Sequence, residues 1–179
     1  MIDKDIVIVG YAGCEGCKLI SKAKFEELTG RFRRDYLNKI IKDDEKDGNP
    51  QDFSAYNIDT VIHVTEGGIL AALYSMAKTA DIGLSIEIRR IPVMQTTIEV
   101  CELYELNPYR LYSNCYILLC DNGFKKAREI SKQGIVASYI GSTSDNIDKI
   151  IIDKDEIEYI NRPTKDEIYR IIPEFIPIL

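Results

Sequence analysis

Two spacings of hydrophobic residues alternate along the chain, and they predict strands interleaved with helices. Short apolar runs and period-two alternation indicate strands, whereas apolar residues three or four positions apart indicate amphipathic helices. The strands are predicted at residues 5–9, 58–64, 84–88, 116–120, 135–140, 149–152 and 157–160. The helices are predicted at residues 14–28, 33–41, 69–74, 96–104, 123–132 and 165–171, with caps expected at Thr96 or Thr97 and at Thr164.

The connections between these elements complete the prediction of the fold class. The charged segment 43–51 contains Gly-Asn-Pro and is expected to be a loop, and the polar segment 141–146 is expected to be a turn. The last two strands are joined only by residues 153–156, which predicts a hairpin. An antiparallel hairpin argues against a purely parallel sheet. We therefore predict an α+β fold in which a mixed β-sheet has helices packed on its faces.

The segment 58–74 is the centre of the predicted fold, because an apolar strand leads through Thr65, Glu66, Gly67 and Gly68 directly into a helix. Two glycines at a helix start let a ligand approach backbone N–H groups, which point outward with the positive end of the helix dipole. The segment is therefore a candidate site for phosphate. Thr65 is expected to cap the helix, and Glu66 to complement the dipole while repelling a phosphate. The alternative is a turn whose glycines pack tightly against the sheet.

Composition limits the functions that the domain can have. With 179 residues, of which 45% are hydrophobic, the chain can bury a substantial core and is predicted to be one domain, residues 1–179. A net charge of -6 and a pI near 4.9 argue against binding to nucleic acids or anionic membranes. No apolar run approaches membrane-spanning length, and no signal peptide is expected. Five cysteines in such a chain predict reduced thiols in the cytoplasm.

Five short segments, which follow one another in the expected order, resemble a known family. Gly-Tyr-Ala-Gly-Cys-Glu-Gly at 10–16 and His-Val-Thr-Glu-Gly-Gly at 63–68 resemble the Gly-x-Ala-Gly-x-Glu-Gly and Asp-Val-Thr-x-Gly-Gly segments of the aminoimidazole ribonucleotide (AIR) synthase superfamily, which includes HypE-like hydrogenase maturation factors. Segments 91–93, 99–103 and 106–109 resemble its Ile-Pro-Val, Cys-Glu-Leu and Leu-Asp-Pro passage. The resemblance implies the C-terminal domain of that family, with partial ferredoxin-like topology. The family's N-terminal ATP-binding domain has no counterpart and is expected to be absent.

His63 departs from the pattern of the resembled family, in which an aspartate at this place supports a metal–nucleotide site between the two domains. A neutral imidazole does not attract Mg²⁺ as a carboxylate does, so the departure implies that the metal role is lost and no metal is expected. Ser113 and Asn114 occupy the place of a family Ser-Ser-Gly or Asn-x-Gly turn, and Cys115 replaces its glycine. Together with His63 they form a degenerate ancestral site. His63 remains a candidate general base or ligand of a softer metal, or a strand-end histidine with one hydrogen bond.

Cys14 and Cys17 form a Cys-x-x-Cys motif at a predicted helix start, where the helix dipole lowers the pKa of a thiol. This spacing suits thiol–disulfide exchange or one half of a zinc site. A complete zinc site would need a second pair of ligands, and the other three cysteines do not form another Cys-x-x-Cys. The alternative is that both are small residues packed in the core.

These observations favour a stand-alone domain that binds or regulates and is not an enzyme on its own, with no cofactor expected and ATP or phosphate as the ligands to consider. We predict a homodimer, because a C-terminal domain without its N-terminal partner should expose apolar surface. The first alternative is half of an ATP-dependent enzyme for phosphoryl transfer or amidine formation. A separately encoded N-terminal-type ATP-binding chain would complete it, with Gly67 and Gly68 contacting phosphate. The second alternative is a thiol-redox module that uses Cys14 and Cys17. Neither nucleic-acid nor membrane partners are expected.

Overall fold

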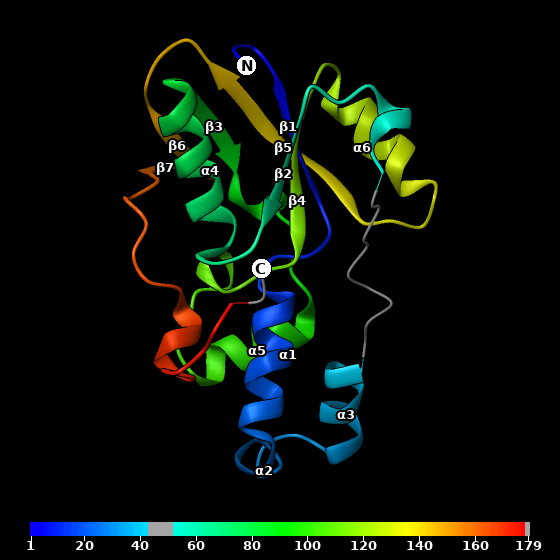
Figure 1. Ribbon diagram of the computed structural model, residues 1–179, viewed down its shortest axis with the longest axis vertical. Helices are drawn as coiled ribbons and strands as arrows, with labels where there is room; N and C mark the ends of the chain where they lie inside the picture. Colours follow the sequence, from blue (N-terminus) through cyan, green and yellow to red (C-terminus); the bar gives the residue numbers. More distant parts are fainter. Residues whose placement is uncertain (43–51, 178–179) are drawn as a thin grey trace.

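The computed structural model describes residues 1–42 and 52–177, and in this part of the chain seven strands form one mixed sheet (Figure 1). The strands lie in the order β2-β4-β1-β5-β3-β6-β7. Neighbouring strands are antiparallel except β3 and β6, which are parallel, and the last two form the predicted hairpin. The strand bounds are β1 (Asp5–Val9), β2 (Thr60–Val64), β3 (Gly83–Glu87), β4 (Cys115–Cys120), β5 (Ala137–Ser144), β6 (Lys149–Asp153) and β7 (Glu156–Tyr159). The predicted mixed sheet is confirmed.

Helices cover both faces of this sheet, so the central strands are buried on both sides. Ile6 and Ile8 of β1 pack in the core beneath the helix α4, whereas Val7 and Val9 pack in the core beneath α6 (Figure 1). A continuous apolar strand is the sequence pattern that such a position requires. No helix in the described residues has the length and apolar content needed to cross a membrane. The helix bounds are α1 (Cys14–Ala23), α2 (Phe25–Leu28), α3 (Arg34–Lys42), α4 (Gly68–Ala80), α5 (Gln95–Leu103) and α6 (Gly123–Ser131).

A second layer of helices lies at one end of the sheet and has its own core (Figure 1). Ile20 of α1, Leu37 of α3 and Val100 of α5 pack there in one buried cluster. Ile168, on the 3₁₀ helix η4 (Glu167–Arg170), is fully buried in the same cluster. The C-terminal segment is therefore held against elements that lie more than sixty residues earlier in the chain.

The prediction of one helix over residues 14–28 is wrong, because the helix is interrupted at Lys24. This residue leaves the helical conformation, with φ of -109° and ψ of 24°, and α2 begins directly after it. The break redirects the chain so that α3 can return and pack against α1. Helix propensity is continuous across this segment, so tertiary packing and not local sequence decides where α1 ends.

The predicted caps of two helices are also wrong. α5 begins after Met94, which makes no side-chain capping bond, so neither Thr96 nor Thr97 is its N-cap. Thr97 is instead turned into the interior and is 1% exposed. The last predicted helix is only the short η4, and its cap is the Asp166 carboxylate, which accepts from a backbone N–H, and not Thr164.

The predicted turn at residues 141–146 is wrong, since β5 continues to Ser144. Glycine, serine and threonine are typical of turns, but here their backbone pairs with β1 on one side and β3 on the other. Gly141 permits this approach, because a Cβ at that position would lie 1.9 Å from the carbonyl oxygen of Ser85. The predicted loop at 43–51 lies outside the described residues.

Candidate functional site

The turn between β2 and α4 is the candidate anion site, and its glycines are required by the backbone itself. Gly67 and Gly68 have φ angles of 81° and 66°, in the left-handed region that L side chains rarely adopt. A Cβ on Gly67 would lie 2.6 Å from the Cβ of Ala71, and one on Gly68 would lie 2.6 Å from the carbonyl oxygen of Tyr109. The fold therefore requires glycine at both positions, whether or not a ligand binds there.

The roles expected of Thr65 and Glu66 at this helix start are wrong. α4 begins at Gly68 without a side-chain cap, and no acidic residue lies in its first turn. The carbonyl oxygen of Thr65 instead accepts hydrogen bonds from the N–H groups of Gly68 and Ser113, both at 3.2 Å. Glu66 lies before the helix, and its carboxylate accepts from the Tyr169 hydroxyl at 3.0 Å. The left-handed glycines place both predicted side chains outside the helix.

The backbone N–H of Gly67, where the sequence predicts a bound phosphate, already donates a hydrogen bond to the buried carboxylate of Asp166. One oxygen of Asp166 accepts from the Gly67 N–H at 2.6 Å, and the other accepts from the N–H groups of Tyr112 and Ile168 at 3.1 Å and 2.8 Å. Asp166 is 2% exposed. Burial raises the pKa of this carboxyl, while the three N–H donors oppose the rise. A phosphate at Gly67 would have to displace Asp166.

The fold brings His63, Ser113 and Asn114 together. Nε2 of His63 lies 2.8 Å from the side-chain oxygen of Asn114, and the His63 ring stacks on Tyr116 with 4.9 Å between ring centroids. Ser113 is fully buried, and its hydroxyl accepts from the Gly13 N–H at 2.8 Å. His63 thus makes the hydrogen bond expected of a strand-end histidine, and Ser113 serves to hold a neighbouring turn.

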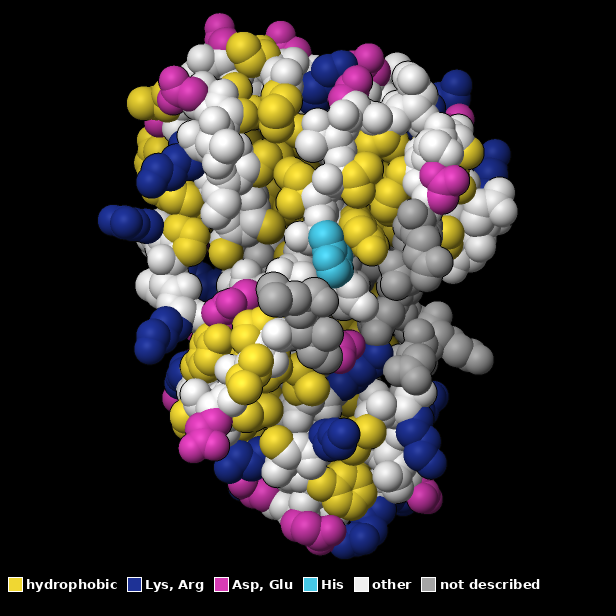
Figure 2. Space-filling view, in the orientation of Figure 1, with side chains coloured by type: hydrophobic (Ala, Val, Ile, Leu, Met, Phe, Trp, Pro, Cys, Tyr) yellow, Lys and Arg dark blue, Asp and Glu magenta, His cyan; other side chains and the backbone are white. Residues whose placement is uncertain are grey.

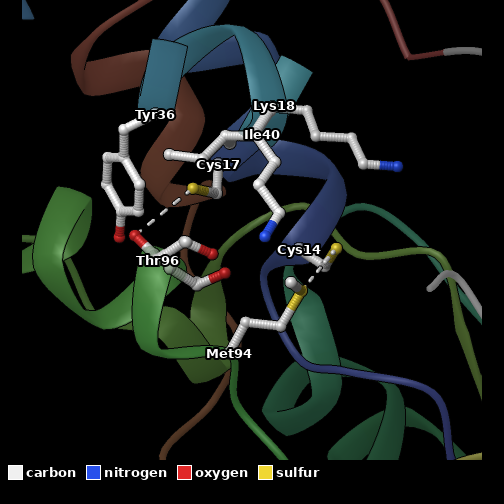
Figure 3. Close-up of a pocket in the computed structure, with 9 residues that line it drawn as sticks. Cys14, Cys17, Lys18, Tyr36, Ile40, Met94 and Thr96 are labelled. Carbon is white, nitrogen blue, oxygen red and sulfur yellow. Dashed lines mark hydrogen bonds between the residues drawn. The ribbon is translucent and has the colours of Figure 1, made fainter. Parts of the chain in front are cut away.

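The two thiols of the Cys-x-x-Cys motif have different partners (Figure 3). The sulfur of Cys14 lies 3.5 Å from the sulfur of Met94, and the sulfur of Cys17 lies 3.7 Å from the carbonyl oxygen of Thr96. Burial raises the pKa of Cys17 to about 11, opposite to the lowering that thiol exchange requires. This arrangement favours small packed residues over a redox pair. Within residues 1–42 and 52–177, no three His, Cys, Asp or Glu side chains form a group that could hold a metal ion.

An open groove of about 570 Å³ runs between β2 and α4. Figure 2 shows His63 near the middle of the visible face, with hydrophobic side chains on both sides of it. β2 is an edge strand, and no other described strand pairs with its outer side. An open groove beside a free strand edge suits another polypeptide better than an enclosed small molecule. The groove is lined by β2, by the following turn and by small residues of α4, among them Ile62, His63, Thr65, Ala72, Ser75 and Thr79.

Asp166 is the residue of this site that the sequence did not reveal. The available local signal was its position as a helix cap, since its carboxylate accepts from the N–H of Ile168 two residues later. Its more informative contact, with Gly67, spans 99 positions of the chain. Periodicity describes only local structure, so it cannot predict a partner at that separation.

No protein-family model and no curated protein matches the sequence, but solved structures match the fold. A chain from the crystal structure of a HypE–HypF complex is 20% identical, with a TM-score of 0.67 over 91% of this chain and 54% of that chain. The hydrogenase maturation protein HypE of E. coli is 16% identical, with a TM-score of 0.68 over 96% of this chain and 53% of that one. Thiamine-monophosphate kinase from Stenotrophomonas maltophilia K279a is 12% identical, with a TM-score of 0.60 over 87% and 52%.

These matches define the class of the domain. Its fold is that of the C-terminal domain of the AIR synthase-like superfamily, to which the matched structures belong, so the predicted fold is confirmed. The chain spans about half the length of the HypE and thiamine-monophosphate kinase chains that it matches. At identities of 20% and below, the likeness shows the fold alone.

Proposed function

We propose that this domain is a non-catalytic binding module that pairs with a second copy of itself through the free edge of β2. One observation carries the proposal: an exposed and uncharged strand edge lies beside a turn whose N–H groups are already engaged within the chain. The free strand edge supports self-association, and the engaged N–H groups argue against a retained nucleotide site.

The internal hydrogen bonds of the turn support a non-catalytic role. The N–H of Gly67 donates to Asp166, and the N–H of Gly68 donates to the carbonyl oxygen of Thr65. A phosphate at this turn would have to break bonds that already satisfy buried groups, and each broken bond carries a desolvation cost. ATP, phosphate and metal are therefore not expected to bind the chain by itself.

The composition of β2 supports a second copy as the partner. The strand reads Thr-Val-Ile-His-Val and carries no Lys, Arg, Asp or Glu, although charged residues are the usual protection of a free strand edge. Val61 is 45% exposed on this strand. Two β2 strands paired antiparallel about a two-fold axis would form a self-complementary contact, in which the same strand of each copy is covered, and this closes the assembly at a dimer.

The small residues of α4 support the same geometry. Ala72, Ser75 and Thr79 line the groove beside β2, so they leave room for side chains that an added strand would direct toward this helix. Ile62 lines the groove, whereas Val61, the residue before it, points to the opposite face of the sheet because successive strand residues alternate. A copied strand would thus cover an apolar position on each face.

The oligomeric state in solution tests this proposal. Light scattering of the pure chain at roughly 50 µM, a concentration at which a moderately tight dimer is populated, should give twice the monomer mass of 20.4 kDa. Hydrogen exchange should show slowed exchange of the β2 amides on raising the concentration across the dimer transition. A mass of one chain throughout this range, or a dimer whose β2 amides exchange as in the monomer, would overturn it.

The half-length match to HypE chains favours one alternative, in which the domain is half of an ATP-dependent enzyme completed by a separate ATP-binding chain. The two functions differ in their response to nucleotide. Thermal unfolding with about 5 mM MgATP should show no stabilisation of the chain alone under our proposal, because ligands raise stability only when they bind the native state. A dose-dependent rise in the melting temperature, lost in Gly68→Ala, would instead support the enzyme half.

A further inference from the structure

A separate cavity lies between α1, α3 and α5, away from the β2 turn (Figure 3). Its volume is about 80 Å³. That is space for roughly three water molecules, at the roughly 30 Å³ that each occupies in the liquid. Much of its wall is apolar, since Cys14, Cys17, Ile40 and Met94 all line it. A small organic molecule with a short hydrocarbon chain matches this size and lining.

The charged lining of this cavity is entirely cationic. Lys18 and Lys39 line it, and none of the lining residues is acidic. Lys18 is 8% exposed, and its ammonium lies 3.6 Å from the carboxylate of Glu15, which balances its charge. Lys39 is exposed and has no ion pair among the described residues. Within this part of the chain, it is the lining cation that lacks an acidic partner.

The carboxylate of Glu99 contacts one of the lining residues. Glu99 accepts a hydrogen bond from the hydroxyl of Tyr36, a lining residue, at 2.6 Å, and another from Gln95 at 3.1 Å. These bonds lower the pKa of Glu99, with the bond from Tyr36 as the main cause. Glu99 is held by Tyr36 and Gln95, and it is not one of the residues that line the cavity.

An unused hydroxyl supplies a second, independent indication of a ligand. Thr97 lines the cavity and is 1% exposed, yet its hydroxyl has no hydrogen-bond partner among the described residues. The nearby thiol of Cys17 is at most a weak partner, because sulfur accepts hydrogen bonds poorly. Buried hydroxyls are normally satisfied, so an unsatisfied one on a cavity wall points to a missing acceptor.

We propose that this cavity binds a short-chain monocarboxylate. The ammonium group of Lys39 attracts the carboxylate, and Thr97 donates its unused hydroxyl hydrogen to it. The apolar walls around Ile40, Met94 and Cys17 contact the hydrocarbon chain. One lysine without an ion pair in the described part of the chain matches a single negative charge, which separates this ligand class from nucleotides and other multiply charged phosphates.

Butanoate, with about six non-hydrogen atoms, is the first probe, and butanamide is its uncharged counterpart of the same shape. In amide NMR spectra of the full chain, butanoate should give saturable shifts confined to α1, α3 and α5, with half-saturation below about 10 mM. Butanamide should bind at least about fivefold more weakly. Absence of saturable shifts would overturn the site, and equal binding of butanamide would overturn its anion selectivity.

Two variants test the assigned contacts. Lys39→Gln should weaken butanoate binding about fivefold, whereas Lys42→Gln, on the same helix but outside the cavity lining, should change it less than about twofold. Thr97→Val should leave the melting temperature unchanged or raised, because it removes an unpaired buried hydroxyl, and should still weaken binding about fivefold. Equal losses in the two lysine variants, or unchanged binding in Thr97→Val, would overturn the assignment.

Discussion

The two edges of the sheet expose similar apolar residues but differ in charge. On β2, Val61 is 45% exposed in a strand without Lys, Arg, Asp or Glu. On β7, Ile157 is 67% exposed, but it lies between Glu156 and Glu158. A second copy aligned with β7 would bring carboxylates together, whereas the strand β2 itself carries no Lys, Arg, Asp or Glu. Exposure alone therefore does not identify an interface, and the distribution of charge distinguishes the two edges.

An aspartate near each of these two edges has a different environment. Beside β2, Asp166 is 2% exposed and accepts three backbone hydrogen bonds. Beside β7, the side chain of Asp153 is 42% exposed and pairs with the still more exposed Arg89. Water can replace the second interaction but not the first, so only the buried aspartate should contribute strongly to stability.

The largest expected effect is the loss of the dimer on charging β2. Val61→Lys should raise the dimer dissociation constant at least about a hundredfold, which is about 2.7 kcal/mol, because two-fold symmetry brings two ammonium groups into one interface. Ile157→Lys is the matched control, since it introduces the same side chain at an exposed aliphatic position of the opposite edge. Sedimentation equilibrium of both variants measures the difference. Equal weakening in the two variants would show that the edges do not differ as proposed.

The next effect is the destabilisation expected when Asp166 loses one acceptor oxygen. Asp166→Asn keeps the shape of the side chain but places an NH₂ group against either the Gly67 N–H or the N–H groups of Tyr112 and Ile168. One or more buried donors would lose their partner, so the free energy of unfolding should fall by about 2 kcal/mol. Urea denaturation measures this change. A loss below about 0.5 kcal/mol would mean that water reaches these N–H groups readily.

A smaller effect concerns the buried thiols, none of which lies on β3, β6 or β7. Burial raises the pKa of Cys17 from 9.0 to about 11, so the unfolded chain releases its proton first as the pH rises. The stability that this thiol contributes is complete below pH 9 and is lost between pH 9 and 11. At pH 10 the loss should be about 1 kcal/mol.

Denaturation of wild type and Cys17→Ala at pH 8 and pH 10, under reducing conditions, isolates this contribution. Other groups titrate in both proteins, and the packing defect of the variant is present at both pH values, so the difference between the two pH dependences belongs to Cys17. The variant should lose less stability than wild type on going to pH 10. Identical pH dependences would mean that Cys17 ionises as readily in the folded chain as in the unfolded one.

Local sequence patterns predicted the sheet well and the candidate site only in part. β1 and β4 are continuous apolar runs, and such runs identify central strands whatever the rest of the chain does. The Gly67 turn was also predictable, because two glycines before an apolar helix leave few other conformations. The closure of that turn by Asp166 was not, since the two residues meet only through the packing of the C-terminal segment. For the same reason, the extension of β5 through residues 141–144 depends on pairing partners distant in sequence.

The smallest effect is expected for Arg89→Gln, which removes the ion pair with Asp153 beside β7. The hydrogen bond from Arg89 holds the pKa of Asp153 below its usual range. Both side chains are in contact with water, where salt and hydration offset most of the Coulomb attraction. We expect no change in unfolding free energy beyond experimental error at 0.15 M salt, a standard ionic strength. If Arg89→Gln lowered the free energy of unfolding as much as Asp166→Asn, the exposed ion pair of Asp153 would be as important for stability as the buried hydrogen bonds of Asp166. That result would contradict the comparison.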